Sequence, residues 1–107
     1  MFLWLVHAHG NTLAKIATGV CDTPVTVAVK SALKNNNNIV VGIATNDGLS
    51  TNAENIGKLL NRKNFYFIPF KQSNPITKPN ALMFNFNKTV ETLEMALDNE
   101  QLQPLLF

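Results

Sequence analysis

Three short stretches carry residue types that bind ligands, and the first is Gly10-Asn11-Thr12. It follows an apolar run and precedes residues at helical spacing, so unbonded backbone N–H groups are expected there at the start of a helix. Such groups, with the helix dipole, attract a phosphate or a carboxylate. Asn11 and Thr12 are also good N-caps, and helix capping needs no ligand. The turn therefore predicts either an anion site or a plain helix start.

The second stretch, Thr45-Asn46-Asp47-Gly48, also follows an apolar run. It offers one carboxylate and two neutral hydrogen-bonding side chains. Asp47 is a candidate acid or base, whereas Asp-Gly in a turn usually serves the backbone conformation. Both interpretations stay open.

The third stretch, Phe70 to Pro79, is long for a connection between two elements. Long loops tend to be functional or disordered. Lys71 and Lys78 are candidates for holding an acidic ligand, and Phe70 for stacking on a flat ring. Two lysines that are merely solvated are the alternative.

His7 and His9 have strand spacing, so they point to one side as two metal ligands would. No Cys, Asp or Glu follows at ligand spacing, and we expect no metal site. The sequence contains no Ser-His-Asp or Cys-His order, no P-loop and no G-x-G-x-x-G motif.

Strands and helices must place these stretches together. Apolar runs without polar alternation predict buried strands at Phe2–Val6, Ile39–Ala44, Phe65–Phe70 and Ala81–Phe86. Helical spacing predicts helices after Gly10, from Pro24 to the asparagine run, from Ala53 to Leu60 and from Thr89 to Leu97. Their inward residues are expected to be Leu13, Ile16, Ala17 and Val20; Val25, Val29, Ala32 and Leu33; Ile56, Leu59 and Leu60; and Val90, Leu93, Met95, Ala96 and Leu97.

Strands that are apolar throughout and alternate with helices indicate a mostly parallel sheet covered on both faces. The expected class is doubly wound α/β, with a Rossmann-like or flavodoxin-like three-layer fold. Ligands in such folds bind beyond the carboxyl ends of the strands, which makes the three stretches one candidate site. We expect a single domain over residues 1–107, with an apolar tail, Gln101–Phe107, packed on a neighbour.

Composition and charge argue against several classes of function. The chain has 107 residues, a formal net charge of +2 and no block of like charge, which argues against a nucleic-acid arm or a polybasic membrane patch. The apolar start is too short for a signal peptide or a membrane span. Cys21 has no cysteine partner, so a reducing, cytoplasmic setting is expected. The run Asn35–Asn38 is interpreted as a loop arising from compositional drift.

Longer stretches resemble a known family. GNTLAKIATGVCDTPVTVAVKSAL, KLLNRKNFYFIPF, KPNAL and QLQPLLF together are similar to the C-terminal part of the B subunits of dipicolinate synthase. These subunits belong to the flavoprotein-like group that includes phosphopantothenoylcysteine decarboxylase. The resemblance extends from Gly10 to Phe107.

The resemblance implies a protein that works with an NAD(P)-binding A subunit in a sporulating mother cell, oxidising dihydrodipicolinate to dipicolinate. It implies FMN as cofactor, a homo-oligomer and a small dicarboxylate substrate. The family's flavin pocket carries over to Gly10, Asn11, Thr12, Thr45 and Asn46. Asp47 matches the family loop that faces cofactor and substrate. The residues Phe70, Gln72 and Lys78 match a second family signature, and we infer that they contact the substrate, because Lys78 suits a dicarboxylate.

The start of the chain departs from the family. A first strand with a Gly-Ser/Thr phosphate turn is missing, and Val6-His7-Ala8-His9 stands where the family has a sequence like Ala-Pro-Cys-Thr. We hypothesise that residues 1 to about 9 are the frame-shifted start of a truncated gene copy. Weak or absent flavin binding and exposed apolar edges that favour association follow from this hypothesis.

Two alternatives to an active subunit stay open. The chain is either an active subunit or a non-catalytic remnant that has kept a partner-facing surface and lost the flavin site. A flavin-dependent decarboxylase is a third interpretation, disfavoured because His7 and His9 lie outside any family motif.

Overall fold

Strands and helices alternate along residues 3–107, the part of the chain that the computed structural model describes. In chain order the elements are β1 (Leu3–Ala8), α1 (Gly10–Thr18), α2 (Pro24–Lys34), β2 (Asn38–Thr45), α3 (Ala53–Leu60), β3 (Phe65–Phe67), β4 (Phe70–Asn74), β5 (Lys78–Phe84), a 3-10 turn (Phe86–Lys88) and α4 (Thr89–Leu97).

β2 is the centre of a five-stranded sheet. β1 pairs with one edge of β2 in parallel, with Ala8 opposite Ile43. On the other edge, β3 pairs in parallel with the first half of β2, and β5 pairs antiparallel with Ala44 and Thr45. β4 then pairs antiparallel with β5. The predicted α/β class is confirmed, but only β1, β2 and β3 are parallel.

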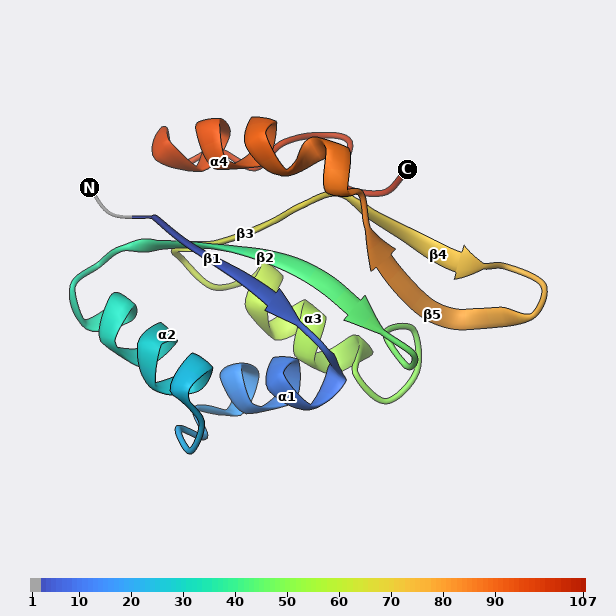
Figure 1. Cartoon of the computed structure of the whole chain (residues 1–107), viewed down its shortest axis with the longest axis horizontal. Helices are drawn as coiled ribbons and strands as arrows, with labels where there is room; N and C mark the ends of the chain where they lie inside the picture. Colours follow the sequence, from blue (N-terminus) through green and yellow to red (C-terminus); the bar gives the residue numbers. More distant parts are fainter. Residues whose placement is uncertain (1–2) are drawn as a thin grey trace.

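The sheet lies between two helical layers, with α1, α2 and α3 on one face and α4 on the other (Figure 1). Ile39, Val41 and Ile43 of β2 pack towards the first layer, and Val40 packs towards Ala96 of α4. The unbroken apolar run of β2 is therefore buried on both faces, as predicted. No helix within residues 3–107 is long and apolar enough to cross a membrane.

The helices α3 and α4 have the predicted bounds, and α2 starts at Pro24 as predicted. Several apolar side chains expected to face inward are instead exposed: Val20, Val25, Leu60, Val90 and Leu97. Thr26 and Thr92 are buried in their helices instead. Each hydroxyl donates to a backbone carbonyl, Thr26 to Thr23 and Thr92 to Lys88, which removes the cost of burying it.

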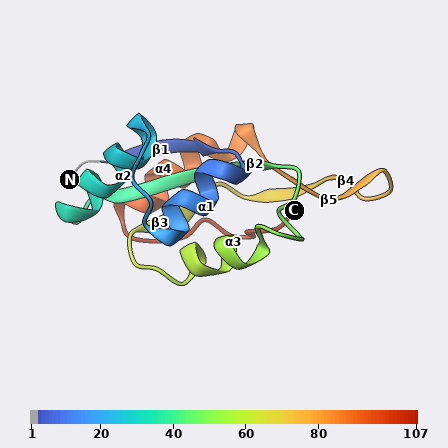
Figure 2. The same ribbon diagram turned by 90° about the horizontal axis from the view of Figure 1, so that it is seen from below.

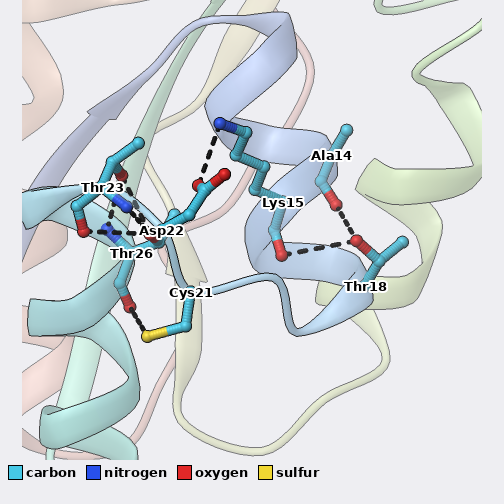
Figure 3. Close-up of polar contacts among 7 residues, drawn as sticks. All are labelled: Ala14, Lys15, Thr18, Cys21, Asp22, Thr23 and Thr26. Carbon is cyan, nitrogen blue, oxygen red and sulfur yellow. Dashed lines mark hydrogen bonds and ion pairs between the residues drawn. The ribbon is translucent and has the colours of Figure 1, made fainter.

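Figure 3 shows the connection between α1 and α2. The Thr23 side chain accepts a hydrogen bond from the Thr26 N–H, while the Thr26 hydroxyl accepts one from the Thr23 N–H, forming a capping box. Lys15 of α1 forms an ion pair with Asp22 at 3.0 Å. These contacts fix the first turn of α2 relative to α1.

β1 differs from its prediction. The predicted strand begins at Phe2, which lies outside the described residues, and the structure extends the strand to Ala8. Burial on both faces was expected, but Trp4 and Leu5 are 40% and 45% exposed. The reason is position, because β1 is at the end of the strand order.

The segment after β3 is also different. The predicted strand Phe65–Phe70 is interrupted at Ile68 and Pro69, and the predicted loop after it is a hairpin of β4 and β5. Asn74 caps the hairpin turn by accepting from the N–H groups of Ile76 and Thr77. Viewed from below, the hairpin projects beyond the rest of the molecule (Figure 2).

Asparagines close the amino end of β2. Asn38 is 1% exposed, and its amide donates to the Ala96 carbonyl at 2.7 Å and to the Asn99 side chain at 2.8 Å. The Asn64 amide donates to the Asn38 side-chain oxygen at 2.9 Å. The prediction that the run Asn35–Asn38 is only a loop is thus wrong at Asn38, which begins β2 and holds it to α4.

The tail from Gln101 packs against the sheet, as expected. Gln101 bonds to the backbone of Phe67, accepting from its N–H and donating to its carbonyl. Further on, the Phe70 N–H donates to the Leu105 carbonyl, and Lys71 Nζ lies 5.4 Å from the centre of the Phe107 ring.

Candidate functional site

The carboxyl ends of β1 and β2 meet at one edge of the sheet. Because the two strands are parallel and Ala8 lies opposite Ile43, the residues that follow each strand are neighbours. His9 Nδ1 lies 3.1 Å from the Ala44 carbonyl oxygen and joins the two ends directly. The structure therefore brings the first two predicted stretches together.

A polar cluster follows the end of β2 and consists of Thr45, Asp47, Asn52 and Asn55. The Thr45 hydroxyl donates to Asp47 Oδ1 at 2.6 Å, and the Asn52 amide donates to the same oxygen at 2.8 Å. Asn55 in turn donates to the Asn52 side-chain oxygen at 2.9 Å. Hydrogen bonds first from Thr45 and then from Asn52 hold the pKa of Asp47 below its ordinary value. Asp47 is therefore an ionised, fixed hydrogen-bond acceptor at neutral pH.

Gly10 packs directly against this cluster. A Cβ atom placed on Gly10 would lie 2.8 Å from Asn52 Nδ2, 3.0 Å from Thr45 Oγ1 and 3.1 Å from Asp47 Oδ1. Glycine is thus needed here for space. The first turn of α1 and the end of β2 form one unit because no side chain separates them.

The start of α1 corrects one expectation. The N-cap is His9, without a side-chain capping bond, so Asn11 and Thr12 are not caps and lie inside the first turn. Asn11 is exposed and Thr12 is half-buried. The helix begins at Gly10 itself, one residue earlier than predicted.

A cavity of about 320 Å³ opens beside the cluster. Its wall on the strand side consists of His9, Gly10, Ala44, Thr45 and Asn46, and its wall on the hairpin side consists of Ser73, Leu82 and Met83. Three of the predicted flavin residues, Gly10, Thr45 and Asn46, line it. The lining combines hydroxyl and amide groups with apolar surface, which suits a flat polar heterocycle.

The remaining predicted contacts are placed elsewhere. Phe70 is 4% exposed in the core and lies 6.2 Å from the Phe67 ring, so it does not offer a face to a ligand. Gln72 donates to the Pro79 carbonyl at 2.9 Å within the hairpin, and Lys78 is exposed at the start of β5. Within the described chain the hairpin contributes Ser73, Leu82 and Met83 to the cavity, and not these three residues.

The histidines have separate environments. The His7 ring stacks on Phe84 with ring centres 5.0 Å apart, whereas His9 bonds to Ala44. Across residues 3–107, no three His, Cys, Asp or Glu side chains gather as a metal site would require.

Sequence reasoning missed Asn52, Ser73, Leu82 and Met83. Asn52 immediately precedes α3, and a polar residue at a helix start opposite a carboxylate is a usable signal. The hairpin residues gave no such signal, because only the antiparallel pairing of β5 with Ala44 and Thr45 brings them to the site. Gly48 was predicted to serve the turn, and the structure adds a steric reason, since a Cβ there would overlap Leu82.

Comparison with known proteins gives consistent matches. The sequence pattern of the Flavoprotein family matches residues 6–97. The dipicolinate synthase B subunit of Bacillus subtilis (strain 168) is 42% identical over 97 residues, which cover 91% of this chain and 48% of that protein. The crystal structure of the dipicolinate synthase B subunit from Bacillus halodurans C superimposes with a TM-score of 0.95 at 42% identity, covering 98% of this chain and 54% of that one. The chain spans about half the length of these relatives.

Proposed function

Because the chain belongs to the Flavoprotein family, we propose that it acts as a B-type subunit of dipicolinate synthase in a sporulating cell. In this proposal it contributes to the oxidation of dihydrodipicolinate to dipicolinate, together with a separate A subunit that binds NAD(P). The observation that carries the proposal is the 42% identity to the Bacillus subtilis B subunit over 91% of this chain. That relative is named as one subunit of a synthase, which supports the expectation of a partner chain.

The cavity residues fit a flavin ring. The α1 turn at Gly10, the Thr45 hydroxyl and the Asn46 amide supply the donors and acceptors that the polar edge of an isoalloxazine requires, and Leu82 and Met83 supply apolar surface for its face. Gly10, Asn11, Thr12, Thr45 and Asn46 would hold the group, which we propose to be FMN. A bound flavin would supply the capacity to accept or pass on a hydride.

The residues around the cavity are less suited to binding the phosphate of FMN than its ring. The cavity lining contains no Lys or Arg, and the ionised Asp47 lies beside Gly10, where an anion would otherwise meet the start of α1. Like charges in a partly enclosed site repel. We therefore expect weak FMN binding, or none, by the 107-residue chain alone. Titration of the chain with FMN, followed by flavin fluorescence, tests this; a purified protein that is yellow contradicts it.

Asp47 is the strongest candidate for a substrate contact. The overall oxidation removes a hydride and a proton from dihydrodipicolinate and delivers the hydride to NAD(P)⁺ on the partner. With its low pKa, Asp47 is a poor general base, so we propose that it accepts a hydrogen bond from the ring of the substrate. The substrate carboxylates need a cation instead, and Lys78, exposed on β5, is the proposed one. Phe70 and Gln72 then act by shaping the hairpin.

Complementation tests the proposal. The gene for this chain is expressed in a sporulating strain from which the B-subunit gene has been deleted, and dipicolinate is measured in the spores by its ultraviolet absorbance. An active chain restores dipicolinate, and Asp47→Ala restores much less, with equal amounts of soluble protein. Dipicolinate that stays at the level of the deletion strain, with the protein present and folded, would falsify the proposal.

The second candidate is a non-catalytic interaction module that has lost the flavin site. The specific observation in its favour is the lining of the cavity, which contains no Lys or Arg to hold the phosphate of a flavin nucleotide. Both candidates predict co-purification with the A subunit. Only the first predicts restored dipicolinate, so binding without complementation selects the second.

A further inference from the structure

The proposed oxidation needs a proton acceptor that the Asp47 cluster does not supply. Conversion of a dihydropyridine ring to a pyridine releases a proton as well as a hydride. Asp47 is a weak acceptor, because hydrogen bonds from Thr45 and Asn52 stabilise its ionised form. The hydroxyl and amide groups of Thr45, Asn46 and Ser73 stay neutral in water and do not take up a proton. Imidazole is the side-chain group that accepts and releases a proton most readily near neutral pH.

His9 brings an imidazole to the cavity. Among the described residues that line the cavity, only His9 has an ionisable side chain. Its position follows from the sheet, since it comes directly after β1, and the parallel pairing of Ala8 with Ile43 sets it beside Ala44 at the end of β2. His9 is exposed at this edge, so a proton taken up by its ring can pass on to water.

A backbone hydrogen bond gives the two ring nitrogens of His9 different roles. Nδ1 lies 3.1 Å from the Ala44 carbonyl oxygen. A carbonyl oxygen only accepts hydrogen bonds, so Nδ1 carries the hydrogen. In the neutral ring Nε2 then holds a lone pair, and residues 3–107 supply no partner for it. The backbone therefore orients the ring and leaves its basic nitrogen free, as a second group does for a catalytic base.

His7 has the same side chain in different surroundings. Its ring stacks on Phe84 with ring centres 5.0 Å apart, and it is not among the described residues that line the cavity. Two histidines that are two positions apart are thus placed for different purposes, and His7 is an internal control for His9.

We propose that His9 is the catalytic residue that accepts the proton in the oxidation of dihydrodipicolinate, an inference that rests on the proposed function. One hydrogen leaves the substrate ring with its bonding electrons, as a hydride, and reduces NAD(P)⁺ on the A subunit. A second hydrogen leaves as a proton and bonds to Nε2 of His9, and the electron pair that it leaves behind completes the aromatic ring. The imidazolium keeps its Nδ1–H on the Ala44 carbonyl and returns the proton from Nε2 to water.

Substitution of His9 in the complex of this chain with the A subunit tests the role. His9→Asn retains a side-chain N–H that can donate to the Ala44 carbonyl but has no group that accepts a proton. The rate of NAD(P)H formation is expected to fall about a hundredfold to ten-thousandfold, the usual contribution of a general base. His7→Asn is the matched control and should keep the rate of the parent chain.

Added imidazole separates a chemical role of His9 from a structural one. His9→Gly removes the ring at a helix N-cap, where glycine is tolerated, and free imidazole is expected to restore part of the lost rate. Circular dichroism and co-purification with the A subunit check that each variant is folded and assembled. If His9→Asn is as active as the parent chain, or imidazole restores no rate, His9 is not the proton acceptor and the proposed function still stands. A parent chain that forms no NAD(P)H with the A subunit overturns both.

The hydrogen on the ring can also be located without any activity. Nitrogen-15 NMR of the parent chain, recorded where the imidazole is neutral, should show the hydrogen of His9 on Nδ1 and a bare Nε2. A hydrogen on Nε2 would contradict the bond to Ala44 and with it the proposed role.

Discussion

Two polar clusters occupy opposite ends of β2, and they are built differently. At the amino end, Asn38 bonds to Ala96, Asn64 and Asn99, all through neutral amide or carbonyl groups. At the carboxyl end, Asp47 is held ionised by Thr45 and Asn52. Each cluster lies beside a cavity of about 320 Å³.

The difference separates a structural cluster from a candidate site. Asn38 is 1% exposed and joins β2 to α4, so its bond to the Ala96 carbonyl pairs two buried polar groups. The Asp47 cluster instead sets a charge beside the first turn of α1, where Asp47 is only partly buried and Gly10 and Thr45 line the adjoining cavity. Variants at the amino end should therefore change stability alone, and variants at the carboxyl end should change the site as well as stability.

The largest effect is expected at Asn38. Asn38→Ala leaves the buried Ala96 carbonyl without this partner and removes the bonds to Asn64 and Asn99, and should lower the free energy of unfolding by about 2–4 kcal/mol. Urea unfolding measures it. Asn61→Ala, at an exposed position, is the control and should change stability by less than about 0.5 kcal/mol. Equal losses of stability in the two variants would contradict the structural role assigned to Asn38.

Gly10→Ala tests the contact between α1 and the Asp47 cluster. The new Cβ would overlap Asn52 and Thr45, and unfolding should become easier by about 1–3 kcal/mol. Nuclear magnetic resonance shifts at Asn52 and Asp47 should change, because the cluster must move.

Gly57→Ala is the matched control for Gly10. Gly57 lies within α3 with nothing within 4 Å of its Cβ position, so alanine there should stabilise the protein by about 0.5–1 kcal/mol. A Gly10→Ala variant as stable as the Gly57→Ala variant would show that the turn has free space.

The pH dependence of stability should distinguish the two ends of β2, because only the cluster at the carboxyl end contains a carboxylate. The folded-state pKa of Asp47 lies below its ordinary value of 3.8, so its stabilising effect is complete well above that value and is lost as the pH falls through the folded pKa. The stability difference between the parent chain and Asp47→Asn should thus shrink between neutral pH and pH values below 3.8. The difference for Asn38→Ala, a neutral cluster, should not follow this pattern. Urea unfolding at a series of pH values measures both, and a constant Asp47 difference would argue against the assigned hydrogen bonds.

The sequence predicted those parts of the molecule in which local pattern and tertiary position agree. The apolar run of β2 and the periodic spacing of α3 and α4 each need one neighbouring layer, and that layer exists. The prediction was wrong where position overrides pattern. β1 has the same apolar character as β2 but stands at an edge, and Phe70 begins a hairpin strand in the core and not a binding loop.

The same distinction applies to the candidate site, of which only the part that follows the parallel strands was predictable. Gly10, Thr45 and Asn46 follow parallel strands, and the carboxyl-end rule places such residues together. Ser73 and Met83 reach the cavity through the antiparallel pairing of β5 with β2, which no local signal in the hairpin sequence indicates. Long-range pairing is thus the information that the sequence pattern did not supply.

The smallest effect is expected at Asn36, which belongs to the amino end and has a positive φ of 57°. Glycine adopts this backbone conformation without the Cβ penalty, so Asn36→Gly should change stability by no more than about 0.5 kcal/mol. Asn36→Ala, which retains a Cβ and lacks the amide, should cost about 1 kcal/mol. Urea unfolding of the two variants resolves the difference. If the two variants lose the same stability, the positive φ of Asn36 does not decide the effect, and the side chain of Asn36 matters more than the turn geometry. The amino end of β2 would then depend on side-chain contacts, as the carboxyl end does.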